Sequence, residues 1–260
     1  MAFFSRYIGI DYSGAATPTT SLKGLRVYVA TLEGDAQEIT PPAGGRKYWS
    51  RQGIADWLAK KLTDGIPTVV GIDHGFSFPL AYFEAHSLPL DWQLFLDDFQ
   101  SHWPTDQADT RVEFIREGRV GKGIHRSGNP RWRRQCEIRC RGKSVFHFDV
   151  QGSVAKSTHA GLPWLNFLRS QQLGPHLHFW PFDGWSIPLG HSVVLEAYPA
   201  LYKTLFDEEG RTPDQHDAYS IARWLCESDQ DGSLIDALQP ALSEEVKALA
   251  AIEGWILGVR

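Results

Sequence analysis

Three short runs of apolar, β-branched residues each lead directly into an acidic side chain. They are YIGID at 7–11, VVGID at 69–73 and VVLE at 193–196. Runs of this length and composition are typical of buried β-strands. GLRVYVATLEG at 24–34 alternates apolar and polar positions instead, which predicts a half-buried strand that forms an antiparallel hairpin with the first run. A further short strand is predicted at 36–40.

Helical periodicity separates these strands. A helix is predicted from about 51 to 63, with Ser50 as its N-cap, and another near 153–171. The helix that begins after Thr212 has the clearest start signal in the chain. Thr212 suits the N-cap, Pro213 suits the first helical position, and Gln215 stands where a capping box requires it.

The stretch from 76 to 148 has no clean hydrophobic period and is rich in Trp, Pro and charge. We interpret it as a long insertion after the fourth strand, with some helix near 89–100. Strands come first and helix–strand alternation follows, which indicates an α/β fold with a mixed sheet and helices packed on it. Because no linker or repeat divides the chain, residues 1–260 are expected to form one domain.

Composition fits this picture of a packed globular protein. Apolar residues make up 42% and charged residues 22% of the 260 positions, close to average values. No apolar run approaches the length of a membrane-spanning helix, so no membrane association is expected. The opening residues do not match a secretory signal, and three cysteines argue against a disulfide framework. A cytoplasmic location is therefore expected.

The net charge of −5 hides a local excess of basic residues. Residues 111–143 contain eleven Lys and Arg against three Glu. Such a segment can contact a polyanion, because fields in salt solution act over about 8 Å and so depend on local charge. The alternative is a solvated loop whose arginines pair with acidic neighbours elsewhere.

The acidic side chains at the predicted strand ends are the main candidates for chemistry. Ligands of open α/β sheets bind outside the carboxyl ends of parallel strands, where Asp11, Asp73 and Glu196 are expected to lie. Each could instead be an ordinary turn or capping residue. Asp217 adds independent weight, because it lies beside the apolar stripe of its helix, where an unpaired charge is costly. Four converging carboxylates would repel one another, and Mg²⁺ or Mn²⁺ would relieve that repulsion.

The motifs GIDYSG, VVGIDHGFSFP, VLEAYPALY and DQHDAYSIARWL, in this order, resemble the ribonuclease H-like fold. More closely, they resemble the group catalogued as domain of unknown function 429, whose members are regarded as predicted nucleases. The resemblance covers 7 to about 257. It implies a five-stranded mixed sheet with three antiparallel strands first and helices on both faces.

The resemblance also implies a site and a reaction. Asp11, Asp73 and Asp217 would hold one or two Mg²⁺ or Mn²⁺ ions, Glu196 would be a further metal ligand or a base beside them, and His216 would position water or substrate. The expected activity is a metal-dependent nuclease or phosphodiesterase acting on nucleic acid or another phosphoester. Candidate contacts to the substrate are Ser13 in GIDYSG, the basic and aromatic residues of the insertion, and a lysine at a helix start: Arg126, Arg131, Trp132, Arg133, Arg134 and Lys156.

Two other functions remain open at this point. GIDYSG also resembles the first phosphate-binding hairpin of actin-like phosphotransferases that use ATP, although no Gly-rich adenosine loop accompanies it. A non-catalytic nucleic-acid-binding protein of the same fold is the other alternative. In that protein the acids would be turn and capping residues and would not bind metal.

Overall fold

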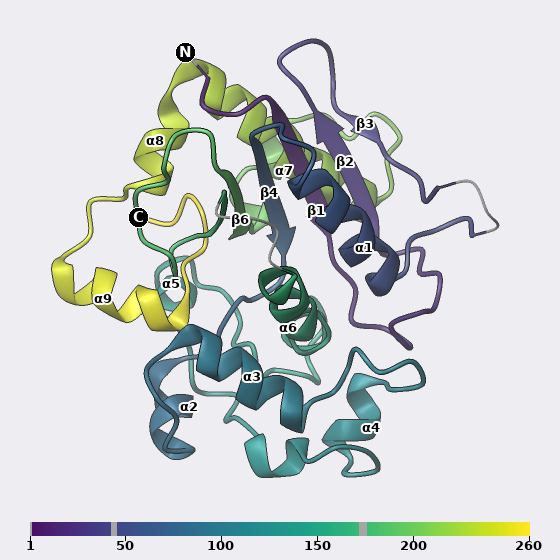
Figure 1. Ribbon diagram of the computed structural model, residues 1–260, viewed down its shortest axis with the longest axis vertical. Coiled ribbons are helices and arrows are strands. Elements are labelled where there is room, and N and C mark those ends of the chain that lie inside the picture. Colours follow the sequence, from purple (N-terminus) through teal and green to yellow (C-terminus); the bar gives the residue numbers. More distant parts are fainter. Residues whose placement is uncertain (1, 43–45, 172–175) are drawn as a thin grey trace.

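A mixed β-sheet forms the centre of the protein (Figure 1). The computed structural model describes residues 2–42, 46–171 and 176–260, and in this part six strands are ordered β3-β2-β1-β4-β6-β5. The strands are β1 (Arg6–Asp11), β2 (Arg26–Ala30), β3 (Gln37–Glu38), β4 (Thr68–Asp73), β5 (Leu177–Phe179) and β6 (Ser192–Glu196).

The strand directions divide the sheet into two parts. β1 pairs antiparallel with β2, and β2 pairs antiparallel with β3. β4 runs parallel to β1, β6 runs parallel to β4, and β5 runs parallel to β6. The α/β class and the mixed sheet are therefore confirmed, and the count of five strands is wrong. The additional strand, β5, is an edge strand of three residues, too short for a hydrophobic pattern to identify it.

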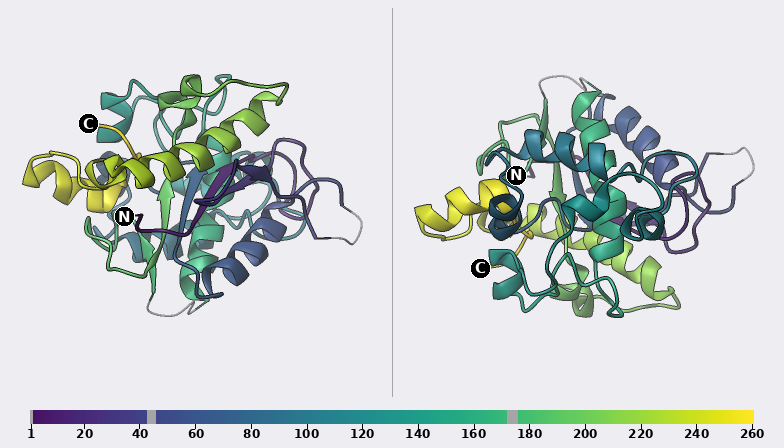
Figure 2. Two further views of the ribbon diagram at one scale, coloured as in Figure 1. Left: turned by 90° about the horizontal axis from the view of Figure 1, so that it is seen from above. Right: turned by 90° about the horizontal axis from the view of Figure 1, so that it is seen from below.

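Helices cover both faces of the sheet (Figure 2). α7 lies along one face, and α1 and α6 cover the other. The helices are α1 (Arg51–Leu62), α2 (Leu80–Ala85), α3 (Trp92–His102), α4 (Val112–Arg116), α5 (Gln135–Arg139), α6 (Ala155–Ser170), α7 (Pro213–Asp231), α8 (Ser233–Leu238) and α9 (Glu244–Glu253). Short 3₁₀ turns lie at η1 (Gly123–Arg126), η2 (Pro199–Leu201) and η3 (Lys203–Leu205).

The predicted helix starts are confirmed at the level of hydrogen bonds. Ser50 caps α1 by accepting a hydrogen bond from the Gly53 N–H at 3.1 Å. Thr212 and Gln215 form the capping box of α7, and Pro213 occupies the first helical position. These interactions satisfy backbone groups that have no partner within the helix. They determine where α7 begins relative to the sheet.

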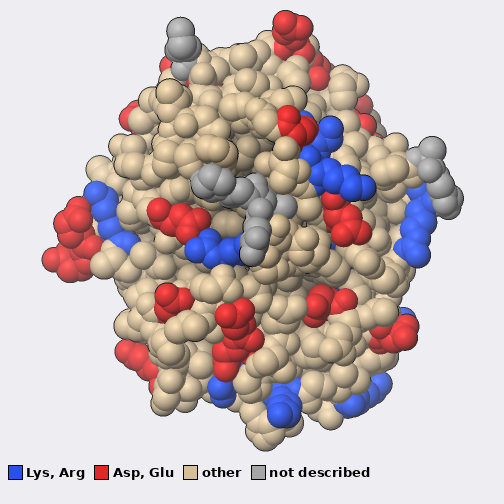
Figure 3. Space-filling model, viewed as in Figure 1, with Lys and Arg blue, Asp and Glu red and all other residues tan. Residues whose placement is uncertain are grey.

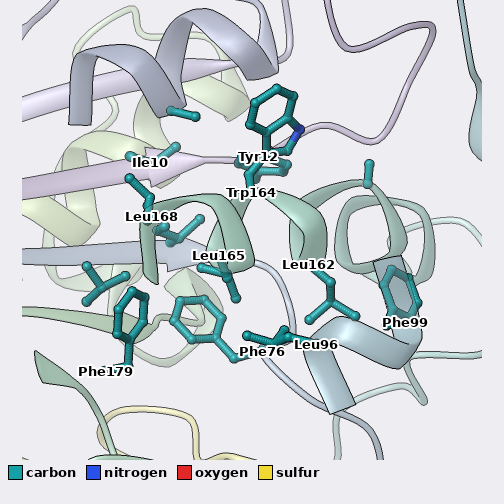
Figure 4. Close-up of a cluster of buried hydrophobic side chains, with 14 of the residues drawn as sticks. Ile10, Tyr12, Phe76, Leu96, Phe99, Leu162, Trp164, Leu165, Leu168 and Phe179 are labelled. Atoms are coloured by element: carbon teal, nitrogen blue, oxygen red, sulfur yellow. The ribbon is translucent and has the colours of Figure 1, made fainter. Parts of the chain in front are cut away.

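The insertion places α2, α3 and α4 beneath α6, whereas α5 lies beside α9 (Figure 1). α3 contacts α6 directly, and α3 confirms the helix expected near 89–100. Leu96 and Phe99 of α3 join Leu162 and Leu165 of α6 in the same buried cluster (Figure 4). This cluster also includes Ile10 of β1. The insertion thus shares its hydrophobic core with the sheet. Within the described ranges, no helix is long and apolar enough to cross a membrane.

Candidate metal centre

Asp11 and Asp73 end two adjacent parallel strands at the same position. In the pairing of β1 with β4, Asp11 is the direct partner of Asp73. Two residues earlier on the same strands stand Gly9 and Gly71, both of which face α7. Because side chains alternate between the faces of a strand, Asp11 and Asp73 also project to the α7 side.

Glycines on the sheet allow α7 to approach unusually closely. A Cβ on Gly9 would lie 2.1 Å from the carbonyl oxygen of Ala218, and one on Gly71 would lie 2.6 Å from Cγ2 of Ile221. Neither distance is possible for a real side chain, so only glycine fits. Asp217 directly precedes Ala218 and lies in the second turn of α7. Close packing of this helix therefore brings Asp217 to the ends of β1 and β4.

The three aspartates converge. One carboxylate oxygen from each of Asp11, Asp73 and Asp217 lies within 4.8 Å of the others. Magnesium–oxygen bonds of about 2.1 Å place neighbouring ligand oxygens about 3 Å apart, so the three carboxylates would have to draw together to coordinate one ion. Three carboxylate oxygens are also the donor type that Mg²⁺ and Mn²⁺ prefer. The residues present therefore fit a hard divalent cation.

The electrostatics of this acid cluster favour a bound cation as well. Burial raises the pKa of Asp11 well above its ordinary value, and the carboxylates of Asp73, Asp214 and Asp217 raise it further. Burial, followed by repulsion from Asp217 and Glu196, raises the pKa of Asp73 to about 8. Without a cation the cluster therefore retains protons at neutral pH. A divalent ion would replace those protons.

Lys203 supplies the positive charge nearest the cluster. Its Nζ lies 2.9 Å from Oδ1 of Asp217. Burial lowers the pKa of Lys203, but the hydrogen bond to Asp217 and attraction to the other aspartates outweigh burial and raise it overall. Sequence reasoning missed this residue, because it lies in the irregular η3 segment and carries no motif. Lys203 partly compensates the charge that Asp217 places beside an apolar helix face.

Asp214 is not among the acids that the sequence predicts for the site, because the positive end of the α7 dipole accounts for an acid in the first turn of this helix. It lies one turn before Asp217, and its Oδ2 would be 3.7 Å from a Cβ on Gly24. The Ser13 hydroxyl oxygen would be 3.6 Å from that same Cβ. Ser13 and Asp214 thus border the cluster on the β2 side. Arg51 holds the Ser13 loop by donating to the carbonyl oxygens of Ser13 and Ala15 at 3.3 and 2.6 Å.

The geometry does not support the expectation that Glu196 is a fourth metal ligand. In the pairing of β4 with β6, Glu196 is the partner of Ile72. An offset of one residue along a strand turns a side chain to the opposite face, so Glu196 points away from the side that carries Asp73. There Arg134 donates to both Glu196 oxygens, at 2.6 and 2.7 Å, and the Phe76 N–H donates at 3.1 Å. These contacts make Glu196 a structural residue and leave it poorly suited to act as a base.

His216 also lies beside the cluster without joining its oxygens. Its ring is buried, and Nε2 lies 3.1 Å from the carbonyl oxygen of Lys203. Nδ1 has no hydrogen-bond partner within the described residues. The contact fits a role in holding the η3 segment, and with it Lys203, against α7.

Most of the predicted basic contacts are engaged within the protein. Arg126 binds Asp98 through two hydrogen bonds of 2.7 and 2.8 Å, and Lys156 pairs with Glu113 at 2.6 Å. Arg134 is 0% exposed, so its expected role in holding a nucleic-acid backbone is wrong. A buried guanidinium that is already paired cannot reach a substrate.

Arg131 and Arg133 are the exceptions, because they are exposed and form no ion pair in the described part of the chain. Trp132 is half-buried and packs edge-on against Phe146, with 6.2 Å between the ring centroids. On the face drawn in Figure 3, basic and acidic side chains lie interspersed and form no continuous basic surface. The drawn face therefore carries no broad basic patch.

Comparison with protein-family models, curated proteins and solved structures gave no significant match. The resemblance to the domain of unknown function 429 group therefore stays a prediction, and the proposals below rest on site geometry.

Proposed function

We propose that the protein is a divalent-metal-dependent hydrolase of phosphodiester bonds, a nuclease of ribonuclease H-like fold. The observation that carries this proposal is the convergence of Asp11, Asp73 and Asp217 within 4.8 Å at the carboxyl ends of β1 and β4. The strand order and the helices on both faces are consistent with that fold, with β5 as an added edge strand. Ligand sites of open α/β sheets lie at this edge.

The three aspartates would hold Mg²⁺ or Mn²⁺. A bound ion supplies Lewis-acid chemistry, because it lowers the pKa of a coordinated water and offsets charge on a phosphate. Lys203, through its hydrogen bond to Asp217, offsets part of the charge of that carboxylate until a cation binds there. Its ammonium group also places a positive charge where an anionic substrate would approach. His216 fixes the backbone of Lys203 and so acts as a positioning residue.

The proposal is tested by hydrolysis assays on metal-free protein to which Mn²⁺ or Mg²⁺ is returned. Substrates are single-stranded and duplex DNA, RNA, and bis(p-nitrophenyl) phosphate, so that a small phosphoester is included. We expect metal-dependent cleavage that is lost in Asp11→Asn, Asp73→Asn and Asp217→Asn. Asp236→Asn, which changes an exposed aspartate of α8 outside the acid cluster, serves as the matched control.

Two results would contradict the proposal. One is hydrolysis unaffected by the three substitutions. The other is an intact protein that binds no divalent metal and cleaves none of the substrates, which would favour the non-catalytic nucleic-acid-binding alternative. Circular dichroism of each variant verifies that the fold is retained.

A further inference from the structure

A cavity of about 140 Å³ opens beside Asp73, on the β6 side of the acid cluster. Three of the residues with a predicted role in binding substrate or metal line it: Asp73, Arg134 and Glu196. Two of the cavity's basic residues, Arg141 and Lys143, come from the turn after the C-cap Cys140 of α5, and the third, Arg134, is the N-cap of that helix. The residues that matter for its charge are Asp73, Arg134, Glu137, Arg141, Lys143 and Glu196.

The six charged residues that line this cavity, three acidic and three basic, sum to zero when all of them are ionised. Glu137 and Glu196 are both paired with Arg134, at 2.9 and 2.6 Å, which leaves that group with a charge of −1. Arg141 and Lys143 add two positive charges at an exposed position, and neither forms an ion pair within the described ranges. Asp73 offsets one of these two charges, so the cavity carries a net charge of +1 when a metal ion neutralises Asp73. Such a hollow attracts an anion.

The turn that carries these two cations is held in place by several contacts. Arg141 adopts the left-handed backbone region at φ +57°, which residues other than glycine rarely occupy. The Gly142 N–H donates to the Glu137 carbonyl at 2.7 Å, and Lys143 Nζ donates to the Gln151 carbonyl. The last contact joins the turn to the segment that includes Gly152, another lining residue. Two of the segments that line the cavity are therefore connected to each other.

The size of the cavity limits what it can hold. At about 30 Å³ per water molecule, 140 Å³ corresponds to roughly five waters. Pockets for drug-sized molecules start at about 300 Å³, so a nucleoside does not fit inside. A phosphate group with part of its hydration does fit. Arginine is well suited to bind it through two parallel hydrogen bonds, and lysine through a point charge.

We propose that this cavity is a phosphate-binding subsite, in which Arg141 and Lys143 hold a phosphate group of the substrate next to the acid cluster. The inference rests on the proposed function and specifies its substrate: a strand bound by its phosphate, with no base enclosed. Cleavage should accordingly show little sequence preference. The same chemistry would accept free inorganic phosphate as a competitor.

The test measures binding of a fluorescent single-stranded oligonucleotide by anisotropy, in an Asp11→Asn background that prevents cleavage. Added to this background are Arg141→Asn, chosen because asparagine tolerates left-handed backbone, and Lys143→Gln. Lys122→Gln removes an exposed charge of the same insertion that does not line the cavity, and serves as the control.

We expect the double variant to bind about tenfold more weakly or worse, since charge-assisted hydrogen bonds to phosphate are lost. The dependence of log affinity on log salt should flatten by about 1.4, that is, about 0.7 for each lost phosphate contact. Inorganic phosphate should compete with the oligonucleotide in the Asp11→Asn parent and not in the double variant. Lys122→Gln should change the affinity by less than about twofold.

Two controls separate this inference from the proposed function. Mn²⁺ binding by calorimetry should be the same in Arg141→Asn/Lys143→Gln as in the wild type, because neither residue belongs to the acid cluster. Unchanged oligonucleotide affinity and salt dependence in the double variant would overturn the subsite, even if metal-dependent cleavage is observed. A wild-type protein that binds no Mn²⁺ or cleaves no substrate would overturn the proposed nuclease activity. If inorganic phosphate still competed with the oligonucleotide for that protein, the phosphate subsite would be retained.

Discussion

Asp11 lies directly opposite Asp73 in the parallel pairing of β1 with β4. Neighbouring strands are about 4.8 Å apart, so this register by itself places two carboxylates side by side at the edge of the sheet. In the next pairing Glu196 lies opposite Ile72, which turns Glu196 to the other face. Register thus separates the acids into a cluster suited to a metal and a buried ion pair.

The raised pKa of Asp73 predicts how stability depends on pH when no metal is present. Asp73 titrates near 3.8 when unfolded and at about 8 when folded, so between these values the folded state binds more protons. Stability must then fall as pH rises through this window, by up to about 1.4 kcal/mol per pH unit for one such group. Thermal melts in EDTA should show Tm falling from pH 5 to pH 8. Asp73→Asn should flatten this decline, and a decline equally steep in the variant would contradict the pKa assignment.

Removing the charge of Arg134 should destabilise the protein severely. Arg134→Met would leave Glu137 and Glu196 buried without a cationic partner, since both are paired with this guanidinium. Breaking a buried ion pair from one side costs about 3–5 kcal/mol. Urea denaturation measures the free energy of unfolding. Arg133→Met is the matched control, because Arg133 is the neighbouring arginine and its side chain is exposed. A loss below about 1 kcal/mol for Arg134→Met would show that the buried pair is not as described.

The close approach of α7 to the sheet depends on Gly9. Gly9→Ala would place a Cβ 2.1 Å from a backbone oxygen of α7, which cannot be accommodated unless the helix moves. We expect a loss of about 3 kcal/mol or more in stability. In any folded fraction we expect weaker Mn²⁺ binding, because Asp217 moves with the helix. Gly24→Ala is the control, since its Cβ would meet only atoms at 3.6 Å or beyond. Equal stability of the two variants would refute this role of Gly9.

Lys203 should compete with the metal for Asp217. Its ammonium must give way, at least in part, when a cation binds the same carboxylate. A partly exposed pair contributes up to about 1 kcal/mol, so Lys203→Met should tighten Mn²⁺ binding by as much as about fivefold. Lys203→Arg retains the charge and should bind Mn²⁺ like the wild type. Calorimetry that finds weaker binding in Lys203→Met would instead make Lys203 a residue that supports the metal site.

Local patterns were sufficient to predict much of this structure. Ser50, Thr212 and Gln215 act within three residues of the backbone groups that they satisfy, so the starts of α1 and α7 could be predicted from the sequence. The strand ends at Asp11 and Asp73 were predictable for the same reason. Their proximity followed from a general property of parallel sheets.

What the sequence did not reveal depends on pairing between distant segments. The register of β6 determines the face on which Glu196 lies. The burial of Arg134 follows from its contacts with Glu196 and with the Glu253 carbonyl, which are separated from it by 62 and 119 positions in the sequence. Lys203 reaches Asp217 from an irregular segment without periodicity. β5 is too short to identify from its pattern. None of these features has a signal within a local window.

The most direct test of the metal centre is a crystal soaked in Mn²⁺ and measured for anomalous scattering. The account predicts an anomalous peak bound by carboxylate oxygens of Asp11, Asp73 and Asp217, with Glu196 still paired to Arg134. A peak bound by Glu196, or no peak at the three aspartates under saturating Mn²⁺, would contradict it.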